Sequence, residues 1–195
     1  MITSTLRTFI LTLLTCGLLV ACNNPETIID MSDTSYSLLN TDSTAVSFPD
    51  DYKDNITVIS FIYTHCPDVC PVITANMKNI QSQLEDTTEI RFVEISFDPE
   101  RDTPSVLANY KSNFKLNEQF SLLTGTQANV DSLLGKMNIL AEKSRIDSVQ
   151  QDSNQYFMKH SNTIYVMDKQ GRIKFEYMGS AVPPEYVAED INKLR

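Results

Sequence analysis

The chain has 195 residues, of which 42% are hydrophobic, and it carries a formal net charge of -9. Once an N-terminal leader is removed, this length leaves room for one domain of about 150 residues, whose core can fold without a framework of disulfides. Lysine and arginine are scattered along the sequence rather than clustered, so the charge pattern of a nucleic-acid-binding protein is missing and nucleic acid is not an expected partner.

The first residues have the pattern of an export signal. Arg7 supplies a positive start, residues 9–20 are apolar but too few to span a membrane, and small residues lead up to Cys22. Residues 19–22 resemble the lipobox of bacterial lipoproteins, in which the cysteine is acylated and becomes the new N-terminus. The resemblance implies a signal peptide at residues 1–21 and a mature domain in the bacterial cell envelope, held at a membrane outside the cytoplasm by its lipids. The alternative is a secreted protein with a free Cys22 thiol.

The segment after Cys22 has the composition of a tether. Serine, threonine, aspartate and asparagine dominate it, and so few apolar residues cannot bury enough surface to order the chain. We therefore expect residues 22–45 to be flexible and the folded domain to span residues 46–195. Residues 36–40 can pair as a short edge strand, but this signal is weak.

Strand and helix patterns alternate in the rest of the chain. The β-branched and aromatic run at residues 57–63 predicts a buried strand, the apolar spacing over residues 72–84 predicts a helix, and residues 90–96 predict a second strand. This order is a βαβ unit with parallel strands.

The second half of the chain continues the alternation and ends in a hairpin and a helix. Together with the βαβ unit, this order predicts a thioredoxin-like fold, an α/β fold in which helices flank a central mixed sheet. The expected elements are a helix capped by Thr103 that ends near residue 114, a strand at 120–123, a helix at 130–141, a surface excursion at 142–155, hairpin strands at 163–167 and 172–177, and a helix from 184 to about 194.

Two cysteines, Cys66 and Cys70, follow the first predicted strand in the sequence Cys-Pro-Asp-Val-Cys. Pro71 does not fit a helix interior, so we expect the regular helix to begin there, with Cys70 near its cap and both thiols in a loop. The positive end of the helix dipole favours thiolate over thiol at this place. The pair can bind one metal ion, act as a redox couple, or form a structural disulfide, which is common in exported proteins.

His160 is one of only two histidines, and we expect it at the start of the late hairpin, near the beginning of the first helix. Two thiolates and an imidazole suit copper, because soft sulfur ligands select copper(I) and imidazole also suits copper(II). Zinc ordinarily requires a fourth ligand or an open water position. His65 adjoins Cys66, which makes simultaneous ligation strained, so we interpret it as a neighbour of the site or an exposed residue.

Several separated motifs closely resemble those of the Sco/SenC copper-delivery proteins. The resemblance covers about residues 57–177 and implies a thioredoxin-like fold in a bacterial lipoprotein form. It also implies copper ligation by Cys66, Cys70 and His160, and a role in assembling the binuclear copper site of cytochrome c oxidase subunit II. The motifs are YTHCPDVCP at residues 63–71, SFDPERDTP at 96–104, LTG at 123–125 and HS at 160–161.

Two departures from the family pattern accompany the resemblance. Lys159 stands where the family commonly has an aspartate, which changes the surroundings of the histidine, and the segment before Thr57 lacks the usual glycine-bearing turn. Asp98 has two interpretations: turn and cap chemistry, or, as the resemblance suggests, a charge behind the metal or facing a partner. Met158, Met167 and Met178 are soft enough to bind copper(I), but we expect them to fill the core.

The leading hypothesis is a membrane-tethered copper chaperone rather than an enzyme. Its open site would pass the ion by ligand exchange to cytochrome c oxidase subunit II or another copper enzyme, and its dithiol could also reduce the cysteines of the acceptor. The alternative is a thiol-disulfide oxidoreductase or peroxidase that uses Cys66 and Cys70. A peroxidatic cysteine requires an arginine at hand, and none adjoins this loop in the sequence. A copper-sensing module that signals by docking is a third hypothesis.

Overall fold

The computed structural model describes residues 25–145 and 156–195. The expected signal peptide and Cys22 lie outside the described residues, as does most of the expected surface excursion. Within the described ranges, no helix combines the length and the apolar composition needed to cross a membrane. The elements are β1 (Ile29–Asp30), β2 (Tyr36–Leu39), β3 (Ala45–Phe48), the 3-10 helix η1 (Asp50–Tyr52), β4 (Ile56–Ile62), α2 (Val69–Ser82), β5 (Ile90–Ser96), α3 (Pro104–Asn113), β6 (Phe120–Gly125), α4 (Gln127–Lys136), β7 (Ala141–Arg145), β8 (Tyr156–His160), β9 (Thr163–Met167), β10 (Arg172–Met178) and α5 (Pro184–Asn192).

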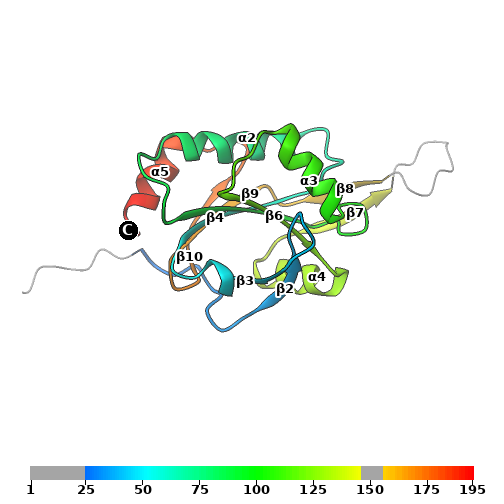
Figure 1. The fold of residues 1–195 in the computed structure, drawn as a ribbon, viewed down its shortest axis with the longest axis horizontal. Coiled ribbons are helices and arrows are strands. Elements are labelled where there is room, and N and C mark those ends of the chain that lie inside the picture. Colours follow the sequence, from blue (N-terminus) through cyan, green and yellow to red (C-terminus); the bar gives the residue numbers. More distant parts are fainter. Residues whose placement is uncertain (1–24, 146–155) are drawn as a thin grey trace, which may run out of the picture.

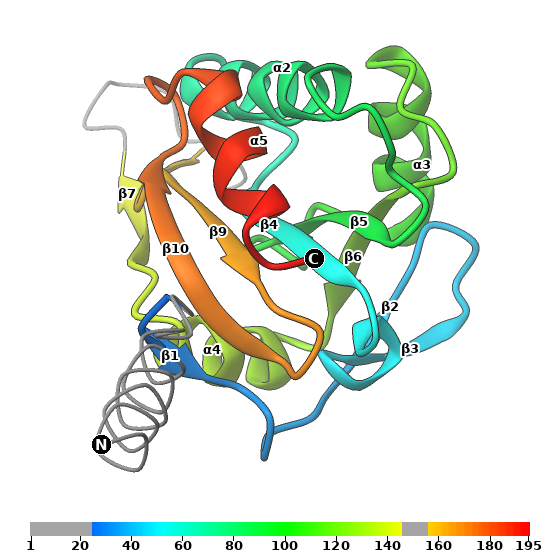
Figure 2. The same ribbon diagram turned by 90° about the vertical axis from the view of Figure 1, so that its left-hand side faces the viewer.

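One mixed sheet of eight strands forms the centre of the described structure, in the order β1-β10-β9-β4-β5-β6-β2-β3. β4 runs parallel to β5 and antiparallel to β9, and all seven of its residues are buried. Its β-branched and aromatic side chains suit a strand that is covered on both sides. Helices α2, α3 and α5 lie on one face, while α4 lies on the other, against the strands β6 and β2, and the strands β2 and β3 curl toward the side of α4 (Figures 1 and 2). The carboxyl ends of β4 and β5 therefore meet at one edge of the sheet, where ligand sites of α/β proteins commonly form.

The sequence-based expectations for the βαβ unit, α3, β6, the β9–β10 hairpin and α5 are confirmed with shifts of a few residues at the ends. The hydroxyl of Thr103 accepts a hydrogen bond from the Val106 N–H, as expected of an N-cap. The helix expected at residues 130–141 is displaced. It begins earlier, because the Thr126 hydroxyl caps it, and it ends at Lys136, shortly before Asn138 takes a left-handed φ of 55°.

The N-terminal stretch belongs to the folded domain, so the flexible tether predicted for residues 22–45 is wrong from Pro25 onward. β1 pairs with β10, and β2 is held between β6 and β3, so the short strand expected at residues 36–40 exists but lies inside the sheet. Met31 and Leu38 are completely or almost completely buried. The ammonium group of Lys174 donates to the Pro25 carbonyl and to the Thr27 hydroxyl, both at 2.9 Å. Composition failed here because backbone pairing with distant strands orders a segment that has few apolar residues of its own.

Substitution of Met31 by alanine tests whether this stretch is part of the core. Removing a buried methionine side chain should lower the free energy of unfolding by about 2–5 kcal/mol. Ile28→Ala is the matched control, because the Ile28 side chain is 50% exposed and its loss should change stability by less than about 0.5 kcal/mol. Urea denaturation measures both. Equal, small effects would contradict the ordered structure of this segment.

Candidate metal centre

The two cysteines lie at the junction of β4 and α2. After β4 the chain makes a turn in which the Cys66 N–H donates to the Tyr63 carbonyl at 3.2 Å. Helix α2 begins at Val69, with Asp68 as its N-cap residue, so Cys70 lies in the first helical turn rather than in the loop where we expected it. Pro71 also lies in that turn, where its missing N–H would have no intrahelical partner. The N–H of Cys70, which also lies in the first turn of the helix, donates to the Cys66 sulfur at 3.5 Å.

His160 reaches the same place from a separate two-stranded ribbon. It was expected to open the late hairpin, but it is the last residue of β8, which pairs with β7, and Ala141 is its register partner. Its Nε2 lies 3.8 Å from the Cys70 sulfur. One ligand atom from each of Cys66, Cys70 and His160 lies within 4.8 Å of the other two. The structure therefore brings together the three side chains that the sequence singled out.

The imidazole of His160 is oriented with its Nε2 atom toward the Cys70 thiol. Nδ1 of His160 lies 2.7 Å from the carbonyl oxygen of Ser161, and because a carbonyl only accepts, Nδ1 carries the proton. In the neutral ring Nε2 then presents its lone pair to Cys70. The ring packs against Phe97 and in a T-shaped arrangement with Tyr63, with centroids 4.8 and 5.7 Å away. A fixed tautomer and a packed ring are the usual preparation of a metal-binding histidine.

The three groups share charge unequally. The hydrogen bond from the Cys70 thiol lowers the pKa of Cys66 to about 3, against the effect of burial, and His160 and two backbone N–H groups lower it further. The pKa of Cys70 is raised, because it donates to Cys66 and because it is buried. Burial lowers the pKa of His160, but its contacts with the Cys66 thiolate and the Ser161 carbonyl outweigh this and raise it overall. Near neutral pH the dithiol therefore carries one negative charge and one proton.

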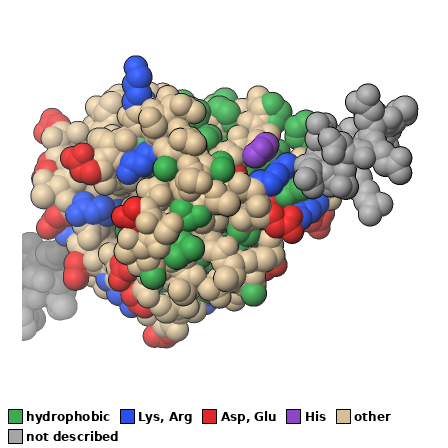
Figure 3. Space-filling model, turned by 45° about the vertical axis from the view of Figure 1, so that its right-hand side comes forward, with side chains coloured by type: hydrophobic (Ala, Val, Ile, Leu, Met, Phe, Trp, Pro, Cys, Tyr) green, Lys and Arg blue, Asp and Glu red, His purple; other side chains and the backbone are tan. Residues whose placement is uncertain are grey.

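The donor set fits a soft metal ion. Two sulfurs and one neutral imidazole nitrogen converge, one sulfur is already charged, and both cysteines are free thiols. His160 is half-buried, so the site is open toward solvent on the histidine side. Figure 3 shows a histidine side chain at the surface, with hydrophobic side chains and lysine or arginine nearby. On the face shown, the basic side chains are spread among acidic ones rather than gathered into a patch.

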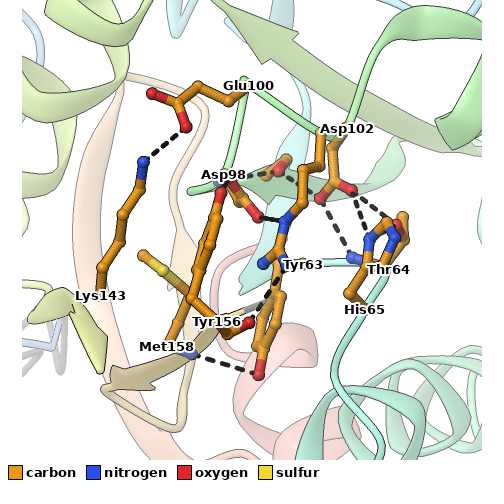
Figure 4. A network of polar contacts seen from close by, with 11 residues as sticks. Tyr63, Thr64, His65, Asp98, Glu100, Asp102, Lys143, Tyr156 and Met158 are labelled. Atoms are coloured by element: carbon orange, nitrogen blue, oxygen red, sulfur yellow. Dashed lines mark hydrogen bonds and ion pairs between the residues drawn. The ribbon is translucent and has the colours of Figure 1, made fainter. Parts of the chain in front are cut away.

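A polar clasp of Asp98, Arg101 and Tyr156 fastens the β7–β8 ribbon to the loop after β5 (Figure 4). The Tyr156 hydroxyl donates to one oxygen of the buried Asp98 carboxylate at 2.6 Å, and Nε of Arg101 donates to the other at 2.5 Å. Nη1 of Arg101 donates to the Tyr156 carbonyl at 3.1 Å, and the guanidinium lies over the tyrosine ring, 3.6 Å from its centroid. Since Tyr156 begins the strand that His160 ends, the clasp holds the strand that carries the imidazole.

The clasp accounts for Asp98 and for an arginine that the sequence did not place near the site. The turn interpretation of Asp98 is confirmed, because its backbone carbonyl accepts from Arg101 and Asp102. Its side chain binds Arg101 and Tyr156, and a role as a charge near the metal or facing a partner stays a prediction. Arg101 lies 35 positions after Cys66 in the chain, yet its guanidinium packs 5.7 Å from the ring centroid of Tyr63. Its spacing from the cysteines offered no signal, because only the fold joins the two loops.

The remaining sequence candidates lie elsewhere. His65 is not part of the three-residue cluster: its side chain is 55% exposed and its Nδ1 lies 3.2 Å from the Thr64 hydroxyl. Met167 is buried in the core, and Met158 is partly buried and packs against the core, as we expected of side chains that fill it. Met178 is 66% exposed, so the expectation that it fills the core is wrong.

Comparison with known proteins decides the family. The SCO1/SenC model matches residues 28–195. The chain belongs to the SCO1/SenC family. This SCO1/SenC protein is 35% identical over 128 residues to the SCO2-like protein of Rickettsia typhi. That match covers 65% of the chain and 61% of the relative, so the chain spans about three fifths of the length of this curated relative.

Solved structures of two other members have the same fold. The structure of Bradyrhizobium japonicum ScoI with copper bound is 29% identical, has a TM-score of 0.69, and is matched over 83% of this chain and 98% of that one. A SCO1/SenC family lipoprotein from Bacillus anthracis is 25% identical, with a TM-score of 0.74 and coverage of 88% and 98%. The expected family and the thioredoxin-like α/β fold are therefore confirmed.

The depressed pKa of Cys66 predicts a distinctive reactivity. The rate of Cys66 alkylation by iodoacetamide, followed on its peptide by mass spectrometry, should change little between about pH 5 and about pH 8, because the thiolate is already present. The same peptide in urea-unfolded protein is the control, and its rate should rise about tenfold per pH unit up to an ordinary thiol pKa of about 8.5. Parallel profiles in the folded and unfolded protein would contradict the charged state assigned to Cys66.

The clasp predicts a stability effect at Tyr156. Tyr156→Phe removes the hydroxyl that donates to Asp98 and leaves a buried carboxylate oxygen without that donor, which should lower the free energy of unfolding by about 1.5–3 kcal/mol. Phe157→Leu is the matched control on the next residue of β8, whose side chain is 46% exposed, and should cost less than about 0.5 kcal/mol. Indistinguishable urea midpoints for the two variants would mean that the clasp does not hold the ribbon.

Proposed function

We propose that this protein is a copper chaperone that binds the ion through Cys66, Cys70 and His160 and delivers it to the binuclear copper site of cytochrome c oxidase subunit II or to another copper enzyme. The observation that carries the proposal is the convergence of two thiols and one imidazole nitrogen in the described structure. Family membership and a related structure with copper bound support the choice of metal.

The donor chemistry favours copper over harder ions. Thiolate and imidazole ligands bind copper tightly, whereas magnesium, calcium and manganese prefer oxygen. The negative charge on Cys66 attracts the cation, and Cys70 becomes the second sulfur ligand when it loses its proton. The site would have three protein ligands, two at the junction of β4 and α2 and one at the end of β8. Such a site holds the ion without enclosing it, which suits an ion that must be transferred to an acceptor.

The surroundings of the site suit transfer by contact with a second protein. Val72, two residues after Cys70, is 43% exposed, and Leu140, whose backbone pairs with Ser161, is 41% exposed. Exposed apolar side chains next to ligands provide a surface on which an acceptor can dock and displace one ligand at a time. His160 belongs to the β7–β8 ribbon rather than to the main sheet, so it is the ligand best placed to leave first.

We further propose that acylated Cys22 anchors the protein to a membrane in the bacterial cell envelope, with the domain in the periplasm or on the outer side of the cytoplasmic membrane. The lipobox pattern at residues 19–22 supports this proposal, and a relative from Bacillus anthracis is described as a lipoprotein. The lipids would place the domain beside membrane-bound acceptors.

Thiol-disulfide exchange is the second candidate function, because a reactive Cys66 thiolate lies beside the Cys70 thiol. Such activity would fit a role in reducing the cysteines of a copper acceptor. Peroxidase chemistry has less support. Arg101 packs on Tyr63, but its guanidinium is engaged by Asp98 and by the Tyr156 carbonyl, so it is not free to act on the thiolate.

Anaerobic titration of the reduced protein with copper(I) against a chromogenic chelator tests the assignment. The wild type should bind one ion per chain, Cys66→Ser and Cys70→Ser should lose stoichiometric binding, and His160→Ala should weaken affinity by more than about tenfold. His65→Ala is the matched control, since it removes the other histidine from an exposed position outside the cluster. It should titrate like the wild type.

Two results would overturn the proposal. Tight binding retained by both cysteine variants would exclude the dithiol as the copper site. Turnover of a disulfide substrate by the metal-free protein, at a rate that His160→Ala leaves unchanged, would favour the oxidoreductase instead.

A further inference from the structure

One short turn after β5 reaches both parts of the metal centre. The turn spans residues 98–102, and inside it the backbone carbonyl of Asp98 accepts hydrogen bonds from the N–H groups of Arg101 and Asp102. The side chains of Asp98 and Asp102 are both buried, yet they bind different partners. Asp98 binds the β7–β8 ribbon that carries the imidazole, while Asp102 binds the loop that carries the cysteines (Figure 4).

Asp102 fixes the backbone just before the first cysteine. Its Oδ2 accepts from the Thr64 N–H at 3.0 Å, and its Oδ1 accepts from the Thr64 hydroxyl at 2.5 Å. The hydroxyl of Ser96, the last residue of β5, also donates to Oδ2, at 2.6 Å. Three donors satisfy this buried carboxylate. Thr64, two residues before Cys66, is therefore held against the turn.

Arg101 carries the connection from the turn to the ribbon. Besides its bond to Asp98, its guanidinium binds the Tyr156 carbonyl, covers the Tyr156 ring and packs beside the ring of Tyr63, which follows β4. The Tyr63 hydroxyl in turn accepts from the Met158 N–H of β8 at 3.4 Å. Nη2 of Arg101 is buried without a hydrogen-bond partner among the described residues. The contacts of the guanidinium must therefore outweigh the lost hydration of one amino group.

His160 is attached to the main sheet from two sides. After His160 the chain enters β9 at Thr163, three residues later. Before it, β8 pairs with β7 in a two-stranded sheet of its own, which the clasp joins to the turn after β5. A strand fastened at one end can pivot about that end, so the clasp at Tyr156 determines the direction in which the imidazole approaches the dithiol.

We propose that Arg101 is a positioning residue for His160. It fixes the span between the imidazole and the dithiol by joining the ribbon to the turn that Asp102 fastens to the cysteine loop. This inference rests on the proposed function and deepens it, because it names a residue outside the ligand set that decides whether copper meets three ligands or the two sulfurs alone. Loss of Arg101 should therefore weaken copper binding through the imidazole and leave the dithiol able to bind.

A double-mutant cycle tests the inference in the full chain. The copper(I) affinity is measured by competition with a chromogenic chelator for wild type, Arg101→Gln, His160→Ala and the double variant. Arg101→Gln should weaken the wild-type affinity by about tenfold, and by no more than His160→Ala does. In the His160→Ala background the same change should alter the affinity by less than about twofold, because the group through which it acts is absent. Equal losses in both backgrounds would overturn the inference.

Arg172→Gln is the matched control. Arg172 forms a comparable ion pair with Asp168, at 2.9 Å, in the turn between β9 and β10. This turn lies at the amino end of β4, away from the cysteines that follow the carboxyl end. Arg172→Gln should keep the wild-type copper affinity. Equal weakening by the two arginine substitutions would reflect a general loss of stability and would contradict the positioning role.

Hydrogen exchange of the metal-free protein provides a readout without copper. In Arg101→Gln the amides of β8 should exchange faster than in the wild type, while those of β4 and β5 keep their protection. Arg172→Gln should leave exchange in β8 unchanged. Unchanged exchange of β8 in folded Arg101→Gln would overturn the inference.

Tyr156→Phe keeps the test decisive if Arg101→Gln does not fold. It removes only the hydroxyl that binds Asp98, and its effect on copper affinity should likewise vanish in the His160→Ala background. The titrations also separate the two claims. Wild-type binding of one ion, with equal losses in both backgrounds, overturns only the role of Arg101. A wild-type protein that binds no copper overturns the proposed function and the inference with it.

Discussion

The approach of the His160 Nε2 to the sulfur of Cys70 is the contact on which the rest of the site depends. It joins a turn after a central strand to the end of a peripheral ribbon, across ninety positions of sequence. The contact holds because β4 is fixed between β5 and β9, while the clasp of Asp98, Arg101 and Tyr156 ties the ribbon to the loop after β5. A soft three-ligand site results from packing of the whole domain rather than from one local motif.

The charge distribution around this contact is consistent with the proposed binding and release of a metal ion. Cys66 is already ionised, Cys70 keeps its proton until an ion or an oxidant arrives, and the imidazole presents a lone pair because its other nitrogen is bound to a carbonyl. In the proposed function, the site would therefore exchange the Cys70 proton for a metal ion.

Sequence reasoning succeeded where local patterns carry the information. The buried run of β4, the Thr103 cap and the alternation of strand and helix patterns predicted the α/β fold, and the Cys-Pro-Asp-Val-Cys spacing predicted the dithiol. The expected fold and the family resemblance added His160 to the two cysteines. It failed where order depends on distant partners. The stretch around Met31 is polar in composition, but its strands pair with β10 and β6. The strand β8, which His160 ends, was not predicted, because its side chains alternate between half-buried and exposed positions. Arg101 and Tyr156 gave no signal because only the fold brings the loop after β5 against the β7–β8 ribbon.

X-ray absorption spectroscopy of the reduced protein loaded with one equivalent of copper(I) tests the central claim most directly. The account predicts a first coordination shell of two sulfur atoms and one imidazole nitrogen, with the nitrogen contribution lost in His160→Ala and kept in His65→Ala. A shell made of sulfur alone in the wild type, or a nitrogen signal that survives His160→Ala, would show that the folded chain does not use this imidazole and would contradict the account.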